Sequence, residues 1–261
     1  MSEPRDRIAR FDREMTERLS TRTEPCRFGT AFFHEGFPRR WDSNFVWLES
    51  DLDGVGAEEL ADDADDVLGR AGLAHRQLYV AELERGRRLT AGFEALGYET
   101  DRDVTMVHTR EPDRWTDARA EEIDLATAKR FYATANREME DGAYAADAEM
   151  LADFHGVIAE RVDTRFFGAM LDGEVVAACE LYLIGPTAQV EDVFTLRAQR
   201  GLGLARAVVL AAVLAAREAG ADLVHLYADD EDWPKQLYAK LGFDEVDRSL
   251  SFLKQPPAQR A

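Results

Sequence analysis

Two glycines in the segment at residues 200–205, RGLGLA, lie where a run of β-branched and apolar residues gives way to a long helical run. The first N–H groups of a helix have no acceptor within it and lie at the positive end of its dipole, so they can bind a phosphate. Gly201 and Gly203 lack the Cβ atoms that would keep a bulky anion away, and Arg200 adds a positive charge. The segment therefore predicts an anion-binding loop.

A second chemically suggestive segment is residues 233–243, WPKQLYAKLGF. Pro234 is typical of a first helical turn, and Gly242 is typical of the residue that ends a helix. Tyr238 lies between them and carries a phenol that can donate a proton. It could equally pack between helix and sheet, with its hydroxyl on a backbone carbonyl.

These two segments resemble motifs of the GCN5-related N-acetyltransferase family. Residues 200–205 resemble its R/Q-x-x-G-x-G/A signature, whose loop holds the pyrophosphate of acetyl-CoA. Residues 233–243 resemble its fourth helix, with the Tyr-x-x-x-Gly-Phe ending. The resemblance is firm over residues 117–254 and only topological before them. It implies an α/β fold with a mixed sheet, the acyl-CoA N-acyltransferase fold, and acetyl-CoA as acyl donor.

The resemblance also implies how the reaction proceeds. An amine attacks the thioester directly, a backbone N–H near residues 194–196 polarises the carbonyl, and Tyr238 protonates the leaving thiolate. Glu191 is the candidate base. The residues expected to hold the cofactor are Phe194, Thr195, Leu196, Arg200, Gly201, Leu202, Gly203, Leu204 and Ala205.

The assignment of Glu191 depends on strand alternation. Side chains alternate along a strand, so Glu191 is expected on the face of Val193 and Thr195, and Asp192 on the opposite face. By resemblance, the face of Glu191 bears the base. The alternative is that Glu191 forms an ion pair with an arginine on a neighbouring strand, and the sequence does not decide between the two.

Helices and strands of a mixed fold must position these residues. Asp172-Gly173 is a strong hairpin signal. The second half of the chain predicts, in order, helices at 124–138 and 147–161, strands at 165–171, 174–184 and 189–196, a helix from about 203, a strand at 222–228 and a short helix ending near 242. The first half predicts a helix at 3–20, strands at 27–34 and 45–49, a helix ending at 70, a strand at 75–81, a helix ending near 96 and a strand at 103–109.

The first half repeats the order of the second, which predicts two tandem modules, residues 1–113 and 114–261. Gly54-Val55-Gly56 falls where Gly201-Leu202-Gly203 falls. The first copy is expected to have lost its cofactor site. Asp53 replaces the arginine, acidic residues 58 and 59 would repel a pyrophosphate, and Phe93 stands where the second copy has its tyrosine.

Composition excludes several classes of function. The chain of 261 residues has a net charge of −19 and an isoelectric point near 4.7, which argues against nucleic acid and anionic membranes as partners. Two cysteines are too few for a disulfide framework or a zinc cluster. No histidine spacing suggests a metal site, so no metal is expected. A leader or membrane-spanning segment is not indicated, and we expect a cytoplasmic protein.

The acyl acceptor is expected to be a small-molecule amine or a protein amine. Acidic residues at 138–149 would suit a cationic amine, although the overall acidity is also typical of salt adaptation. A monomer or a homodimer is expected. Two competing interpretations are a non-catalytic acyl-CoA-binding or regulatory protein and a dinucleotide-binding protein. Arg206 argues against the second, because close packing of helix on sheet requires glycine or alanine there.

Overall fold

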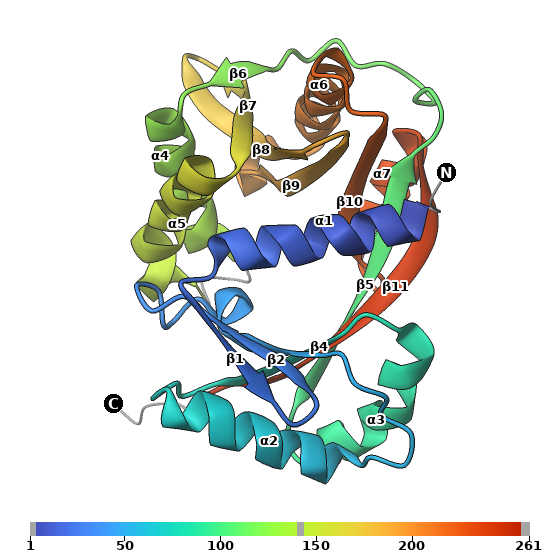
Figure 1. The fold of residues 1–261 in the computed structure, drawn as a ribbon. Helices are drawn as coiled ribbons and strands as arrows, with labels where there is room; N and C mark the ends of the chain where they lie inside the picture. Colours follow the sequence, from blue (N-terminus) through green and yellow to red (C-terminus); the bar gives the residue numbers. More distant parts are fainter. Residues whose placement is uncertain (1–3, 140–143, 257–261) are drawn as a thin grey trace. The chain divides into compact units, whose positions relative to one another are not determined.

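The computed structural model describes residues 4–139 and 144–256, which form two compact units (Figure 1). The unit that contains most of the second half comprises residues 1–15, 105–228 and 233–246, and we call it the C-terminal unit. The N-terminal unit comprises residues 16–104, 229–232 and 247–261. Both are built from helices and a sheet, as the sequence predicts.

The sheet of the C-terminal unit is mixed, with the strand order β6-β7-β8-β9-β10-β5. Strands β6 to β9 are antiparallel neighbours, whereas β9 and β10 are parallel. Its strands are β5 (Glu99–His108), which it shares with the N-terminal unit, β6 (Glu121–Ile123), β7 (Asp163–Leu171), β8 (Glu174–Ile184), β9 (Thr187–Thr195) and β10 (Leu223–Asp229). Its helices are α1 (Pro4–Leu19, up to Met15), α4 (Leu125–Glu138), α5 (Ala148–Arg161), α6 (Leu204–Glu218) and α7 (Pro234–Lys240).

Helices cover both faces of strands β7 to β9 (Figure 1). Helix α6 is rich in alanine, valine and leucine and is buried along most of its length, so it packs closely on one face. Cys179 of β8 lies on that face, and its Sγ contacts the carbonyl of Val208 in α6 at 3.3 Å. The next residue toward the N-terminus, Ala178, belongs to the opposite face, where it packs with Phe131 and Tyr132 of α4.

Strands β9 and β10 pair only over their first residues. The parallel register joins Thr187–Gln189 to Leu223–His225, but β9 continues to Thr195 and β10 to Asp229. Beyond Gln189 the two strands diverge, and β9 leads directly into the glycine loop and α6. The fold therefore opens a gap in the sheet next to the segment that the sequence predicts to bind an anion.

The N-terminal unit has the strand order β1-β2-β3-β4-β11. Its elements are β1 (Arg22–Cys26), β2 (Gly29–Phe33), β3 (Phe45–Leu48), α2 (Ala57–Arg70), β4 (Arg76–Val80), α3 (Leu83–Ala95) and the later part of β11 (Phe243–Lys254). The strand expected at 27–34 is the second arm of a hairpin. Its first arm is missing from the sequence prediction because Pro25 and charged residues disguise an edge strand.

A strand, helix, parallel strand succession occurs in both units. In the N-terminal unit β3, α2 and β4 form it, and in the C-terminal unit β9, α6 and β10 do. This repeat confirms the tandem architecture. The compact units, however, do not divide at residue 113. The end of β11 pairs with β4, with Leu250 opposite Val80, so residues 247–256 join the N-terminal unit. The boundary near residues 111–113 was predicted between the two repeated copies along the sequence, and it stays a prediction.

Candidate active site

The glycine loop begins α6 with two residues in the left-handed region. Gly201 has a φ of 83° and Gly203, the N-cap of the helix, a φ of 78°. A Cβ at Gly201 would have no atom within 4 Å, so this position opens onto free space. At Gly203 a Cβ would approach Thr116 Oγ1 to 2.7 Å. The loop is therefore open to its surroundings at Gly201, whereas Thr116 occupies the space beside the N-cap Gly203.

Arg200 connects the loop to the end of β9. Its Nε donates to the carbonyl of Thr195 at 3.2 Å, and its guanidinium lies 5.7 Å from the centre of the Phe194 ring. Leu202 is exposed, whereas Leu204 is buried and anchors the helix. Ala205 follows in the first turn of α6. The predicted cofactor residues thus lie along one stretch of chain from the end of β9 to the first turn of α6, and their role as cofactor ligands stays a prediction.

One predicted hydrogen-bond donor is already used inside the sheet. The N–H of Leu196 donates to the carbonyl of Val176 at 2.9 Å, so Leu196 does not offer its N–H to a thioester. Within the described residues, the buried Thr195 Oγ1 has no hydrogen-bond partner. The other two predicted donors are the N–H groups of Phe194 and Thr195, and their role toward the thioester stays a prediction.

A β-bulge in β9 changes the predicted orientation of the acidic residues. Glu191 lies opposite Glu180 of β8 and Phe194 opposite Ala178, so two residues of β9 face only Cys179. The first of them, Asp192, has a φ of 50°. Glu191 therefore shares a face with Phe194 and not with Thr195, and the expected simple alternation is wrong. The only sequence signal is that aspartate tolerates the left-handed region better than most residues.

Glu191 is half-buried on the face that α4 and α5 cover. Gln189 lies two residues earlier on this face, and its Nε2 donates to the Glu191 carboxylate. The residue across the strand pair is Glu180. The arginine of the alternative interpretation does not stand at that position. The role of Glu191 as a base remains a prediction, and the structure shows Gln189 and Glu180 as its neighbours.

Tyr238 of α7 is buried and packs edge-on against Phe243, with ring centres 6.3 Å apart. Burial raises the pKa of its phenol far above the ordinary value, and the nearby Glu191 carboxylate raises that pKa further. The phenol therefore keeps its proton at neutral pH and lies within electrostatic range of Glu191. The alternative interpretation predicts a hydrogen bond from this hydroxyl to a backbone carbonyl. Within the described residues the hydroxyl makes no hydrogen bond.

A polar cluster that the sequence does not reveal lies next to Glu191, at the strand pair of β8 and β9. His155 of α5, Glu180 of β8 and Asp192 of the bulge come together, with Tyr132 and Tyr182 around them. Burial raises the pKa of the Glu180 carboxyl, and the His155 ring opposes that rise. These residues come from separate elements, so no spacing along the chain indicates them.

Three further residues with polar or reactive side chains, His225, Cys179 and Arg206, lie in the core. His225 is fully buried, and burial lowers its pKa to about 3. The rings of Phe11 and Tyr227 pack edge-on against its ring, with ring centres 5.0 and 5.6 Å away. Cys179 is also fully buried. Arg206 of α6 is buried too, and its Nη1 donates to the carbonyl of Arg114 at 2.9 Å. It occupies the position where a dinucleotide site needs a small residue.

The corresponding loop of the N-terminal unit is built differently. Gly54 has a φ of 78°, but Gly56, which caps α2, has a φ of −89°. Asp53 forms an ion pair with Arg88 at 3.4 Å. Phe93 is fully buried and stacks on Phe252 with ring centres 4.2 Å apart. A hydrophobic contact thus replaces the tyrosine of the second copy, which supports the prediction that the first copy lacks a cofactor site.

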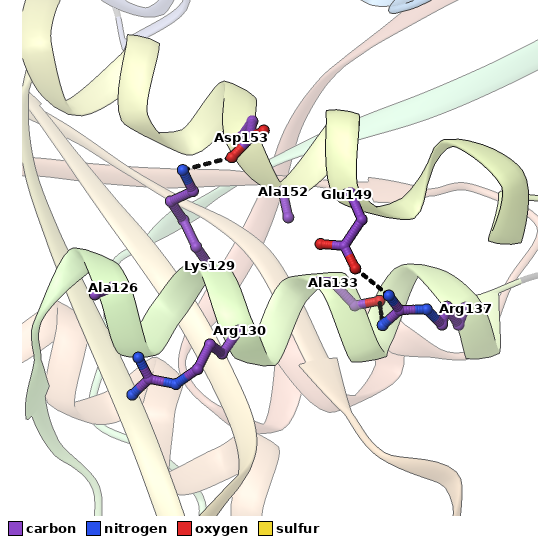
Figure 2. A pocket seen from close by; sticks show the side chains of 8 residues that line it. All are labelled: Ala126, Lys129, Arg130, Ala133, Arg137, Glu149, Ala152 and Asp153. Carbon is purple, nitrogen blue, oxygen red and sulfur yellow. Dashed lines mark hydrogen bonds and ion pairs between the residues drawn. The ribbon is translucent and has the colours of Figure 1, made fainter.

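Residues of helices α4 and α5 also line an open pocket of about 410 Å³ (Figure 2). Lys129 and Asp153 pair across it at 2.5 Å, and Arg137 pairs with Glu149. Arg130 extends from α4 beside them. Since each acidic side chain here is held by a basic one, the cavity has little net charge left for a ligand. None of the predicted site residues lines it.

One family model matches a stretch of the chain that contains the glycine loop, Glu191 and Tyr238. Residues 117–243 match the model of the Acetyltransferase (GNAT) family. This part of the chain is a GNAT domain. The match contains β6 to α7, and therefore the diverging strands, the loop and both candidate catalytic residues. No curated protein matches the chain.

Solved structures resemble the fold over most of the chain. A conserved protein of unknown function from Staphylococcus epidermidis has a TM-score of 0.73 at 14% identity, covering 91% of this chain and 95% of that one. A GCN5-related N-acetyltransferase from Kribbella flavida has a TM-score of 0.63 at 17% identity, covering 97% and 96%. A tandem GNAT protein from the clavulanic acid biosynthesis pathway has a TM-score of 0.54 at 15% identity, covering 84% and 75%. At these identities the fold is shared.

Among residues 4–139 and 144–256, no helix combines the length and apolar character needed to span a membrane. The acidic loop expected at 138–149 lies partly outside the described residues, because positions 140–143 are not described.

Proposed function

We propose that this protein transfers an acetyl group from acetyl-CoA to a primary amine. The observation that carries the proposal is the divergence of β9 from β10 after Gln189, directly before the open Gly201 position and between Glu191 and Tyr238. The GNAT match of residues 117–243 supports the choice of acyl donor.

Each part of the reaction has a candidate group. The first N–H groups of α6 and Arg200 would hold the pyrophosphate, and the thioester would lie in the gap beyond Gln189. The amine nitrogen attacks the thioester carbonyl and forms the new C–N bond. Glu191 accepts the proton that the amine loses. Tyr238 donates its proton to the thiolate as the C–S bond breaks. The ammonium form of the amine loses one proton to solvent before it attacks, and the proton on Glu191 returns through solvent to the Tyr238 phenolate, so charge and protons balance.

The acceptor that suits this site is a cationic amine. Burial raises the pKa of the Tyr132 and Tyr182 phenols, and the charges of Glu180, Asp192 and Glu191 raise it further, so these three carboxylates of β8 and β9 lie close together. A second ammonium group on the acceptor would be attracted to them. A comparison of a diamine with an amino acid of similar length, at matched salt, tests this. A preference for the amino acid would contradict the cationic acceptor and leave acetyl transfer itself intact.

Acetyl-CoA binding tests the cofactor assignment. Gly201→Glu places a carboxylate in the open space of the loop, and we expect it to abolish the rise in melting temperature that acetyl-CoA causes in the wild type. The matched control is Gly173→Glu in the β7–β8 hairpin. Gly173 has a φ of 84°, against 83° for Gly201, and a Cβ there also meets nothing within 4 Å. Equal loss in both variants, or no shift in the wild type, would contradict the assignment.

Turnover separates catalysis from binding alone. We expect Glu191→Gln to lower kcat by about 10²- to 10⁴-fold and Tyr238→Phe by at least about 10-fold, with acetyl-CoA binding unchanged. Release of free CoA thiol over a panel of amines measures this. If the wild type binds acetyl-CoA but acetylates none of them, the non-catalytic acyl-CoA-binding interpretation gains. If both variants keep full activity, the roles of these residues are wrong.

A further inference from the structure

Three potential metal ligands converge on the face of the sheet that α4 and α5 cover. They are His155 of α5, Glu180 of β8 and Asp192 of the β9 bulge. His155 Nδ1 lies 2.5 Å from Glu180 Oε1 and 3.9 Å from Asp192 Oδ2. All three ligand atoms lie within 4.8 Å of one another. One ion at ordinary coordination distances could contact all three if Nδ1 and Oε1 move apart to the roughly 3 Å that separates neighbouring ligands of one ion.

The cluster holds one fully buried carboxylate and a second that is partly exposed. The Glu180 side chain is 0% exposed, that of His155 is 6% exposed and that of Asp192 is 36% exposed. A proton on His155 would offset one of the two carboxylates. Glu180 Oε1 is close to Nδ1 but accepts no hydrogen bond of proper direction from the described residues. Buried carboxylates are normally paired or bound to a metal.

Outer groups hold each ligand in place. Tyr182 Oη donates to Glu180 Oε2 at 2.5 Å, which leaves Oε1 directed at the cluster. The Tyr132 ring stacks on His155 with centres 4.3 Å apart and planes at 23°. Its hydroxyl donates to the main-chain carbonyl of Asp192 at 3.0 Å and so supports the left-handed bulge residue. Such second-layer contacts are typical of metal sites.

We propose that His155, Glu180 and Asp192 form a binding site for a divalent transition-metal ion. One imidazole and two carboxylates suit Zn²⁺ or Mn²⁺ and disfavour Ca²⁺ and Mg²⁺, which prefer oxygen ligands alone. Three protein ligands leave a coordination position for water. The ion would join α5, β8 and β9 at the bulge, behind Glu191. The proposal does not depend on acetyl transfer, but a bound ion would offset the charges of Glu180 and Asp192, so the diamine and the amino acid are compared in metal-free protein.

Metal binding by the full-length protein tests the site. Protein without an affinity tag is treated with a chelator and titrated with Zn²⁺ or Mn²⁺ by calorimetry. We expect one ion per chain and a melting temperature raised by several degrees when the free metal is about 100 times its dissociation constant. Mg²⁺ at the same concentration should produce neither effect. If neither Zn²⁺ nor Mn²⁺ binds at about 1 mM, the proposal is wrong and His155 forms a simple ion pair with Glu180.

Asp192→Asn is the decisive variant, because asparagine accepts the left-handed backbone as readily as aspartate. We expect it to weaken metal binding at least about 10-fold. Asp172→Asn is its matched control. Asp172 has a φ of 52°, against 50° for Asp192, but lies in the β7–β8 turn. His155→Gln should also lose binding, although a buried change can unfold the protein. Equal affinity of the two asparagine variants would overturn the proposal.

Discussion

At the scale of single residues, surroundings decide what a side chain does. His155 and His225 are both buried in the C-terminal unit. His225 meets aromatic rings, and burial lowers its pKa to about 3, so it stays neutral. His155 instead meets two carboxylates. His225 is therefore a packing residue, whereas His155 is a candidate ligand, although both are histidines.

Asp12 of α1 offers a prediction about pH. Burial raises the pKa of its carboxyl to about 7, and the hydrogen bond from Tyr227 Oη at 2.7 Å only partly opposes this. The folded protein therefore holds this proton more tightly than the unfolded chain, whose aspartates titrate near pH 4. Ionisation of Asp12 should lower the free energy of unfolding as the pH rises from about 4 to about 7.

Asp12→Asn should remove that loss, since asparagine keeps an acceptor for Tyr227 and does not ionise. We expect the variant to gain a few kcal/mol, on the order of 2 to 4, over the wild type between pH 4 and pH 8. Urea unfolding across this range measures it. Asp222→Asn is a control of opposite sign, because Arg7 lowers the pKa of Asp222. A difference between wild type and Asp12→Asn that does not change with pH would contradict the prediction.

At the scale of elements, the end of α7 depends on the absence of a side chain. Gly242 has a φ of 97°, and a Cβ there would lie 1.9 Å from the carbonyl oxygen of Arg110. Its N–H and carbonyl also form main-chain hydrogen bonds, the carbonyl with Thr109 at 3.0 Å. The end of the short helix that carries Tyr238 is thereby fixed to residues 109 and 110, which follow β5.

Gly242→Ala should therefore destabilise the protein by about 3 kcal/mol or more, from backbone strain together with the clash. Gly97→Ala is the matched control. Gly97 ends α3 at the equivalent place in the first copy with a φ of 81°, but a Cβ there meets nothing within 4 Å. We expect it to cost about 1 to 2 kcal/mol. Chemical unfolding followed by circular dichroism compares them, and equal losses would argue against the close approach at Gly242.

At the scale of the whole molecule, net charge is the dominant property. The net charge of −19 on 261 residues means that acidic side chains repel one another, and they do so more strongly in the folded state than in the expanded chain. The many exposed ion pairs, such as Arg70 with Asp66, contribute little each. Screening of the net repulsion should therefore outweigh the weakening of these pairs.

We expect the melting temperature to rise by several degrees between about 0.05 M and 1 M KCl, because the Debye length shortens to about 3 Å. Thermal unfolding over a salt series measures this. Sucrose at matched osmolality serves as the control, since it is excluded from the surface without screening charge. A melting temperature that falls with KCl, or that rises equally with sucrose, would contradict the electrostatic explanation.

The sequence by itself determined the features that depend on neighbours along the chain. The glycine loop, α6 and the short helix of Tyr238 were predicted correctly, because turns, caps and a helical period involve residues a few positions apart. The repeat of strand, glycine turn and helix also predicted the tandem fold.

Only the tertiary structure decided which distant residues meet. The bulge at Asp192 depends on pairing with β8 and moves Phe194 onto the face of Glu191, since one extra residue reverses every later side chain. The same pairing brings Glu180 and Asp192 to His155 of α5. Likewise, the end of β11 joins β4 across most of the chain length. Such contacts follow from long-range packing, which local periodicity does not encode.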